Sequence, residues 1–273
     1  MPMRLDLHVH STASDGAWSP AAVARGAAGR LDVIALTDHD TTAGVAAASA
    51  AAAEHALHVI PAVELSSTHR GRDVHVLGYF VDPSAKSLRD HEAHAGGARE
   101  RRMEAMIARL AAQGVLVDMD AVLRVAGPER GSLGRPHLAR VLVEAGHATS
   151  VPDAFDRWIG DAHKAFVPTS LTDPAGAVEV VKGAGGIAVW AHPPLDLIDT
   201  LLPGMVRAGL RGLEVYRPRA DPQQAAHLER TARTAGLVVT GGSDWHSPDF
   251  GFRLGDFHVT GDELARFLEE GGM

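Results

Sequence analysis

Histidine, aspartate and glutamate residues recur at the ends of apolar segments along nearly the whole chain. In the first segment, DLHVHS, His8 and His10 lie two residues apart in a strand-like run, so both side chains leave the same face. Later segments add single side chains in the same setting: Asp15, His39, Glu64, His75, His192, Asp244 and His246. These six imidazoles and three carboxylates offer enough donors for two or three divalent ions if one carboxylate bridges. We therefore expect one polynuclear metal site.

Chance placement is the competing interpretation, because the chain has 16 histidines. Taken singly, His75 or His192 could equally be a hydrogen-bonded core histidine. The joint recurrence favours metal, since buried charges at so many strand ends would be costly without ions or partners. The remaining histidines outside such settings are expected to be surface or structural residues: His55, His58, His69, His91, His94, His147, His163, His227 and His258.

Mixed imidazole and carboxylate donors suit Mn²⁺, Fe²⁺ or Zn²⁺ better than Mg²⁺ alone, and we favour Mn²⁺, with Fe²⁺ or Zn²⁺ as alternatives. A water between two such ions would be acidified toward neutrality, so a metal-bound hydroxide could attack an ester without a nucleophilic serine or cysteine. Asp6, Asp38 and Asp40 are candidates for orienting the ligand histidines. Asp40 could equally cap the following helix.

The apolar segments are near-continuous rather than alternating, a pattern typical of parallel strands buried on both faces. Helical segments separate them, the first beginning at Ser19 as N-cap with Pro20 in its first turn. Seven strands alternating with helices predict a βα barrel. Catalytic groups of such barrels lie at the C-terminal strand ends, where these side chains fall.

Residues 86–164 differ, because successive helical stretches occur there without a convincing strand. We expect them to form an all-helical insertion over the barrel mouth, between barrel parts 1–85 and 165–273; its helices are predicted at 98–114, 118–127, 135–146 and 151–160. Arg99, Arg101 and Arg102 are expected to form a solvated helix face. Arg135 and Lys164 could point toward the metals, or could serve solubility alone.

Composition limits the function classes. The 273 residues, 45% of them hydrophobic, can bury a large core as one α/β barrel. The absence of cysteine removes disulfides and thiolate ligands, and the formal charge of −8 argues against a broad basic nucleic-acid platform. The Ala-rich run at 43–53 is too short to cross a membrane, and a strand begins where a signal peptide would lie. We expect a cytoplasmic protein with no membrane association and no stable protein partner.

The ordered set DLHVHS, TDHD, AVELS, DVHVLGY, AHP and GSDWH resembles the motifs of the PHP (polymerase and histidinol phosphatase) superfamily. This resemblance implies a distorted, TIM-like seven-stranded βα barrel. The insertion segments RPHLARVLVEAG and HKAFVP resemble the subgroup typified by the bacterial TrpH/YciV proteins. Members of that subgroup are phosphoesterases that remove the 3′-phosphate from nucleoside 3′,5′-bisphosphates or trim short RNA from the 5′ end.

Carried onto this chain, the resemblance implies a trinuclear centre. His8, His10, Glu64 and Asp244 would hold a first ion, Asp15, His39 and His246 a second, and His75 and His192 a third, with Glu64 bridging the first and third. Arg135 and Lys164 would bind substrate phosphate, with His137 as a further candidate. Phe166 stands where relatives often have Tyr, and Pro194 where some have Gly with a nearby Arg, which bears on substrate preference.

The sequence therefore predicts a metal-dependent phosphoesterase acting on nucleotides or short 5′-phosphorylated oligoribonucleotides. The nearest alternative is a small-metabolite phosphatase of the histidinol phosphate type, against which the long insertion argues. An amidohydrolase-like enzyme would use a similar centre but would need no cluster of phosphate-binding cations. A non-catalytic metal-binding module would have no reason to keep so many polar groups at one site.

Overall fold

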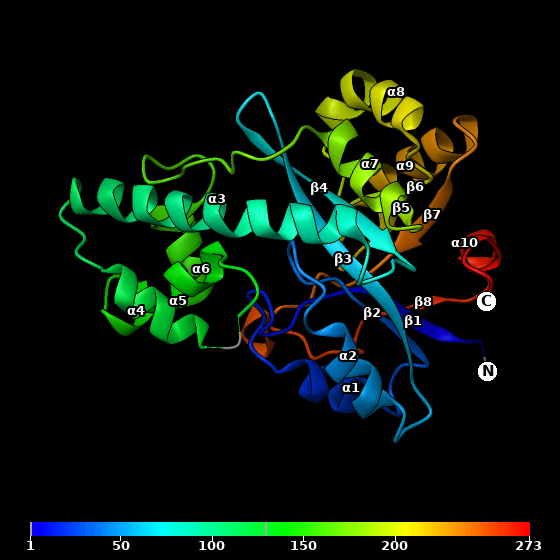
Figure 1. The fold of residues 1–273 in the computed structure, drawn as a ribbon, viewed down its shortest axis with the longest axis horizontal. Helices are drawn as coiled ribbons and strands as arrows, with labels where there is room; N and C mark the ends of the chain where they lie inside the picture. Colours follow the sequence, from blue (N-terminus) through cyan, green and yellow to red (C-terminus); the bar gives the residue numbers. More distant parts are fainter. Residues whose placement is uncertain (1, 129) are drawn as a thin grey trace.

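One sheet curls into a nearly closed barrel (Figure 1). The computed structural model describes residues 2–128 and 130–273. Within that part, the strand order is β7-β6-β5-β4-β3-β2-β1-β8. Their bounds are β1 (Arg4–Val9), β2 (Val33–Leu36), β3 (His58–His69), β4 (Arg72–Tyr79), β5 (Ile187–Trp190), β6 (Gly212–Tyr216), β7 (Val238–Gly241) and β8 (Val259–Thr260). The barrel closes where the chain after β7 returns to β1, because the N–H of His10 donates to the carbonyl of Trp245 over 2.9 Å. The predicted barrel class is confirmed.

Two strands, β4 and β8, run against their neighbours, which corrects the expectation of parallel strands throughout; β8 pairs antiparallel with β1. β3 and β4 form an antiparallel hairpin, and β4 pairs antiparallel with β5. The loop between them is the dipeptide Arg70–Gly71, with φ of 50° and 79°. Positive φ at both central residues is the geometry of a type I′ hairpin turn. The near-continuous apolar run of β4 arises because both its faces are buried, whatever its direction.

Helices cover the outside of the barrel, and three of the six named below, α1, α7 and α9, begin where the side chain of an N-cap residue accepts a backbone N–H. The predicted cap at Ser19 is confirmed, since its Oγ accepts from Ala22 N. Asp40 is not a cap, because α2 begins after Gly44. The covering helices are α1 (Pro20–Ala27), α2 (Val45–Ala52), α7 (Pro174–Gly183), α8 (Ile198–Ala208), α9 (Pro222–Thr234) and α10 (Ala265–Glu270). Short 3-10 helices span Leu195–Leu197 and Pro248–Phe250.

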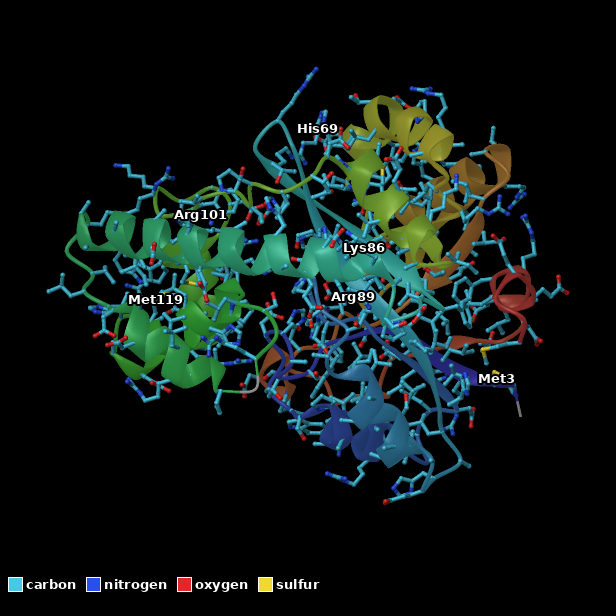
Figure 2. All side chains as sticks on the ribbon, viewed as in Figure 1. Met3, His69, Lys86, Arg89, Arg101 and Met119 are labelled. Carbon is cyan, nitrogen blue, oxygen red and sulfur yellow. The ribbon has the colours of Figure 1, made fainter. Side chains whose placement is uncertain are left out.

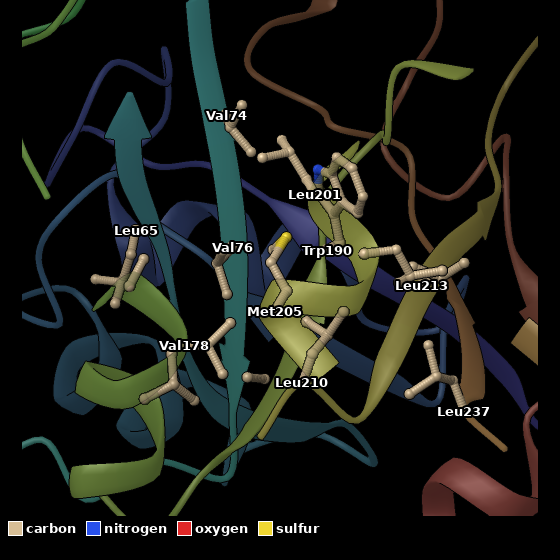
Figure 3. Packing of buried hydrophobic residues seen from close by; sticks show 14 of the residues in the cluster. Leu65, Val74, Val76, Val178, Trp190, Leu201, Met205, Leu210, Leu213 and Leu237 are labelled. Carbon is tan, nitrogen blue, oxygen red and sulfur yellow. The ribbon is translucent and has the colours of Figure 1, made fainter. Parts of the chain in front are cut away.

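The two faces of the sheet bury different sets of side chains. Outside, Val178 of α7 and Leu201 and Met205 of α8 pack against Val76 and Trp190 of the sheet (Figure 3). Inside, apolar residues at alternate positions fill one end of the barrel, among them Ile60 and Ala62 of β3 and Leu77 and Tyr79 of β4. The next inward position on β3 is Glu64, and on β4 it is His75. One face of each strand thus carries core residues at one end and polar ligands at the other.

The segment between β4 and α7 is helical and has a hydrophobic core of its own. Its helices are α3 (Lys86–Ala111), α4 (Met119–Ala126), α5 (Arg135–Glu144) and α6 (Val151–Ala154), followed by a π-helical turn at Phe155–Ile159. Met106, Leu110, Leu138 and Leu142 belong to this core. Helix α3 starts well before the predicted residue 98, and Leu88 near its beginning packs in the barrel's outer cluster. This one long helix runs from the barrel to the helices of the insertion (Figure 1), and it contributes side chains to the hydrophobic clusters of both.

None of the helices in residues 2–128 and 130–273 combines the length and apolarity needed to cross a bilayer.

Candidate metal centre

Glu64 lies at the centre of the converging side chains. Its Oε1 is 2.8 Å from His75 Nδ1 and 3.1 Å from His192 Nε2. Its Oε2 is 3.1 Å from His39 Nδ1 and 3.3 Å from the Nε2 atoms of both His8 and His10. Glu64 is 1% exposed. The five imidazoles that meet this carboxylate come from four separate segments of the chain, because His8 and His10 share one.

The donors form three overlapping groups, each with ligand atoms within 4.8 Å of one another. The first group is His8, His10, Glu64 and Asp244; the second is His10, Asp15, His39 and His246; the third is His39, Glu64 and His75. His192 adjoins the third group through its contact with Glu64 Oε1. The structure thus brings together all nine side chains that the sequence singled out as ligands.

Unusual backbone conformations orient several of these side chains toward the cluster. Register between β1 and β2 shifts between Asp6 and Val9, where β1 carries His8. His192 and Asp244 have φ of 31° and 55°, in the left-handed region that non-glycine residues rarely adopt. Such strained residues persist where the surrounding structure requires them, which is common at functional sites. Both follow the ends of inner strands, so the strain turns their side chains into the barrel mouth.

The donor atoms fit divalent cations. Among the described residues, His8 Nε2, His10 Nε2, His39 Nδ1 and Glu64 Oε2 are buried without a hydrogen-bond partner. Buried polar atoms are almost always satisfied, so orphans gathered at one point indicate a missing partner. A cation would satisfy imidazole lone pairs and carboxylate oxygens together. The side chains therefore constitute a metal-binding cluster.

The charges around the cluster also favour a cation. Burial opposes ionisation of Glu64, yet His39, His75 and His8 hold the pKa of its carboxyl well below its ordinary value. Burial likewise opposes ionisation of Asp15, but His39 and His246 hold its pKa well below normal. The ligand carboxylates therefore stay ionised.

Burial lowers the pKa of His10, an effect that His246 reinforces. It also lowers the pKa of His39 well below its ordinary value, despite the nearby carboxylates of Glu64 and Asp15. These imidazoles are neutral, which is the state that binds metal.

Glu214 is a polar residue of the site that sequence reasoning missed. It lies in β6, is fully buried, and accepts from His8 Nδ1 over 2.8 Å and from the backbone N–H of His192 over 2.7 Å. A carboxylate inside the apolar run GLEVY was the available signal, because a lone buried glutamate in a strand requires a partner.

The three aspartates expected to orient ligand histidines have other roles, which corrects that interpretation. Asp6 accepts from the backbone N–H of Ser243 over 2.8 Å, and Asp38 accepts from Ser11 and Ser14. Both therefore fix the loops that carry ligands. Asp40 instead binds side chains of the insertion.

The interpretation of Arg99 and Arg102 as a solvated face is wrong. Arg99 is 4% exposed, and its Nε donates to Asp40 Oδ2 over 2.6 Å. It also donates to Ser66 Oγ and to the carbonyl of Leu133, while His91 Nε2 lies 2.7 Å from Asp40 Oδ1. Arg102 donates to Asp73 Oδ2 over 2.8 Å. Arg101 alone of the three is exposed on α3 (Figure 2). The prediction for Arg99 and Arg102 was wrong because the burial of their side chains depends on how α3 packs on the barrel.

A cavity of about 490 Å³ opens over the cluster. Gly134, Arg135 and Phe155 of the insertion line it together with Arg102, and residues after β6 line another part, among them Arg217 and Arg219. Sequence reasoning did not single out those two arginines. The cavity thus joins the metal-binding cluster to several cations.

Two of the three side chains expected to bind phosphate lie away from this cavity. Within the described part of the chain its lining includes Arg135 but not Lys164, which is exposed, or His137, which is 1% exposed. His137 Nδ1 accepts the N–H of Gly134 over 3.1 Å, so it caps α5. The backbone beside it approaches the cluster closely, since a Cβ added to Gly134 would lie 2.0 Å from Asp15 Oδ2.

Comparison with known proteins gives consistent relatives, although no family model matches the chain. A 5′-3′ exoribonuclease of Haemophilus influenzae is 33% identical over 93% of this chain and 94% of its own length. A 3′,5′-nucleoside bisphosphate phosphatase of Chromobacterium violaceum is 34% identical over 91% and 89%. A phosphoribosyl 1,2-cyclic phosphate 1,2-diphosphodiesterase of Eggerthella lenta is 36% identical over 91% and 98%.

Two solved structures share the whole fold. A candidate metal-dependent phosphoesterase of Bifidobacterium adolescentis superposes with a TM-score of 0.89 at 34% identity, covering 99% of this chain and 98% of its own. A Chromobacterium violaceum structure described as an amidohydrolase, with bound sulfate and no metal, has a TM-score of 0.87 at 32% identity over 98% and 96%.

A curled α/β sheet with an imidazole–carboxylate cluster at its mouth, together with relatives whose names describe the cleavage of phosphoric esters, defines a metal-dependent hydrolase of phosphoric esters. Sequence identity above 30% over most of both chains narrows this class to a family. The chain belongs to the PHP-like metal-dependent phosphoesterases, related to the 5′-3′ exoribonuclease and the 3′,5′-nucleoside bisphosphate phosphatase.

Proposed function

We propose that this protein hydrolyses phosphate esters of nucleotides, with nucleoside 3′,5′-bisphosphates or short 5′-phosphorylated oligoribonucleotides as substrates. The observation that carries the proposal is the cavity of about 490 Å³, whose lining combines the ligand cluster with Arg102, Arg135 and Arg217. That volume lies within the usual range for small-molecule sites. Guanidinium groups are suited to phosphate because their planar donors match its oxygens.

The ligand groups support two or three ions, with Mn²⁺ the most suitable and Fe²⁺ or Zn²⁺ as alternatives. His8, His10, Glu64 and Asp244 would hold the first, Asp15, His39 and His246 the second, and His75 and His192 the third, with Glu64 shared. Bound ions of this kind acidify water and neutralise charge that builds on a phosphoryl group. The protein supplies the fixed geometry, since the donors arise from strand ends and buried loops.

Arg135 is the insertion residue best placed to bind phosphate. It is the first residue of α5 and lines the cavity. Its guanidinium lies over the rings of Phe155 and Phe166, 5.5 Å and 5.1 Å from their centroids, and its Nη1 donates to Asp161 Oδ1 over 2.5 Å. Stacking on the two rings holds the guanidinium group of Arg135 in place before substrate binds. Phe166 provides this support without the hydroxyl that a tyrosine would offer.

Four substrates assayed in parallel with Mn²⁺ test the proposal: adenosine 3′,5′-bisphosphate, a short 5′-phosphorylated RNA, histidinol phosphate and phosphoribosyl 1,2-cyclic phosphate. Release of phosphate or of mononucleotide, followed by chromatography, identifies the bond that is cut. We expect turnover of one or both nucleotide substrates to exceed that of the others.

The other outcomes would redirect the assignment. Turnover of histidinol phosphate alone would make the protein a small-metabolite phosphatase. Preference for the cyclic phosphodiester would align it with the activity named for the Eggerthella lenta relative. Absence of turnover on all four by metal-loaded protein would contradict the proposed substrate class.

A further inference from the structure

We infer that Glu214 is a positioning residue that sets the ion affinity of two of the three ligand groups at once, while leaving the second group untouched. The inference deepens the proposed metal centre and rests on it. Glu214 is fully buried in β6, a strand that supplies none of the nine expected ligands. Its two carboxylate oxygens face two different ligand histidines, one from β1 and one from the loop after β5.

The first oxygen fixes the tautomer of His8. Glu214 Oε1 lies 2.8 Å from His8 Nδ1, and an ionised carboxylate can only accept. Nδ1 must therefore carry the proton, which leaves the lone pair on Nε2. That atom faces the cluster, 3.3 Å from Glu64 Oε2 and 3.4 Å from Asp244 Oδ1. A carboxylate behind a ligand histidine orients the ring and raises its basicity.

The second oxygen holds the backbone that carries His192. Glu214 Oε2 accepts the N–H of His192 over 2.7 Å, where φ is 31°. A non-glycine residue keeps this conformation only when its surroundings impose it. The bond anchors the strained peptide, so the imidazole stays against Glu64 Oε1 at 3.1 Å. Without the carboxylate, the backbone could relax and withdraw the ligand.

Arg217 completes the arrangement from the side of the cavity. Its Nη2 lies 3.5 Å from Asp244 Oδ2, and its Nε lies 3.8 Å from Glu214 Oε2. Glu214 contacts His8, the backbone of His192 and Arg217, whereas the ion pairs of Asp15 and His39 in the described part of the chain are with other residues of the cluster. Loss of Glu214 should therefore affect the ions at His8 and at His192, and spare the ion at Asp15.

Metal binding by the Glu214→Ala protein is the test. Chelator-stripped protein is titrated with Mn²⁺ by calorimetry, and bound metal after desalting is counted by mass spectrometry. We expect Glu214→Ala to weaken binding of the ions at the first and third groups by about 10–100-fold. One ion at the second group should keep its wild-type affinity.

Glu214→Gln separates positioning from packing, because it preserves volume. The two donors meet different oxygens of Glu214, so the amide oxygen of glutamine can face only one of them and its NH₂ group must face the other. The metal affinity of this variant should fall between those of wild type and Glu214→Ala. The matched control is Glu229→Gln, since Glu229 on α9 accepts from the hydroxyl of Tyr216, away from the cluster.

Wild-type stoichiometry and affinity in both Glu214 variants would overturn the inference, and so would equal weakening of every ion. Circular dichroism identifies a variant that fails to fold, in which case the Glu214→Gln comparison decides. These readouts need no substrate. Wild-type protein that binds Mn²⁺ yet turns over no nucleotide would contradict the proposed substrates and leave this inference standing.

Discussion

Arg135 is the cation of α5 that lines the cavity, so its removal separates substrate binding from metal binding. Charged hydrogen bonds contribute about 1.5–3 kcal/mol, and Arg135→Ala should therefore raise KM for a phosphorylated substrate by roughly 10–100-fold. Steady-state kinetics and a count of bound Mn²⁺ measure both effects. Metal content should stay at its wild-type level, because Arg135 contacts Asp161 and aromatic rings rather than the ligands.

Lys164→Ala is the matched comparison for Arg135→Ala, because the sequence predicted that both side chains bind phosphate. Lys164 is exposed and does not appear in the described lining of the cavity, so its removal should change KM much less than the Arg135 substitution. An equal rise in both variants would show that the insertion rearranges to bring Lys164 to substrate. Unchanged kinetics in Arg135→Ala would refute its role.

His137 makes stability depend on pH. Burial lowers its pKa to about 4, so the unfolded chain takes up a proton before the folded chain as pH falls below 6.5. The stability that neutral His137 contributes is present at neutral pH and is lost between about pH 6.5 and 4. The pKa difference between the unfolded and folded states lowers the free energy of unfolding by about 2 kcal/mol between pH 7 and pH 5.

Urea unfolding of wild type and His137→Gln at pH 7 and pH 5 measures this contribution. Glutamine can still accept the N–H of Gly134 but does not titrate. The other histidines are present in both proteins, so their titration cancels in the comparison. A difference between the proteins that does not change with pH would mean that folding leaves the pKa of His137 unchanged.

At the level of elements, α3 is joined to the barrel by a buried ion pair beside a ligand. Arg99 on α3 binds Asp40, which follows His39 directly. Arg99→Met would leave the carboxylate buried without its charged partner, which costs about 3–5 kcal/mol. The free energy of unfolding in urea checks this, and Arg101→Met on the exposed side of the same helix should change it by no more than about 0.5 kcal/mol. Equal effects would mean that Arg99 is solvated.

The elements that sequence reasoning mispredicted have separate physical causes. Caps such as Ser19 depend on neighbours in the chain and were predictable. The direction of β4 depends on the turn at Arg70 and Gly71, whose two positive φ values do not show in hydrophobic periodicity. Helix α3 was started too late because Gly96 and Gly97 weaken the local signal. Strand β8 has two residues, which is below what a pattern can indicate.

At the scale of the whole molecule, ion binding should be a stability determinant. Ions that bind only the folded chain stabilise it by about 2.7 kcal/mol at one hundred times Kd. For a chain of this size, that corresponds to a rise of about 5–10 °C in Tm. We expect chelation to lower Tm and Mn²⁺ to restore it, as followed by calorimetry. Mg²⁺ should restore less, because it coordinates imidazole poorly; a Tm indifferent to chelation would contradict a structural contribution of the ions.

The convergence of the side chains could be predicted where the whole architecture dictates their location, while their role as ligands stays a prediction. Residues that end inner strands of a barrel must meet at its mouth, so His8, His39, Glu64 and Asp244 could be grouped from the chain alone. Glu214 was missed because its partners are known only once β6 lies near β1 and β5 in space. The position of Lys164 likewise depends on how the insertion folds.

The hairpin of β3 and β4 has a consequence for the order of folding. Glu64 lies opposite Leu77, and Ser66 opposite His75, in a register set by a two-residue turn. Contacts this close in sequence form in microseconds, whereas parallel pairing across long connections is slower. The central carboxylate and one of its histidines can thus meet before the rest of the barrel exists. The hairpin of a newly synthesised chain would then bind a cation weakly through Glu64 and His75. Later strands would add their ligands around an ion that is already bound.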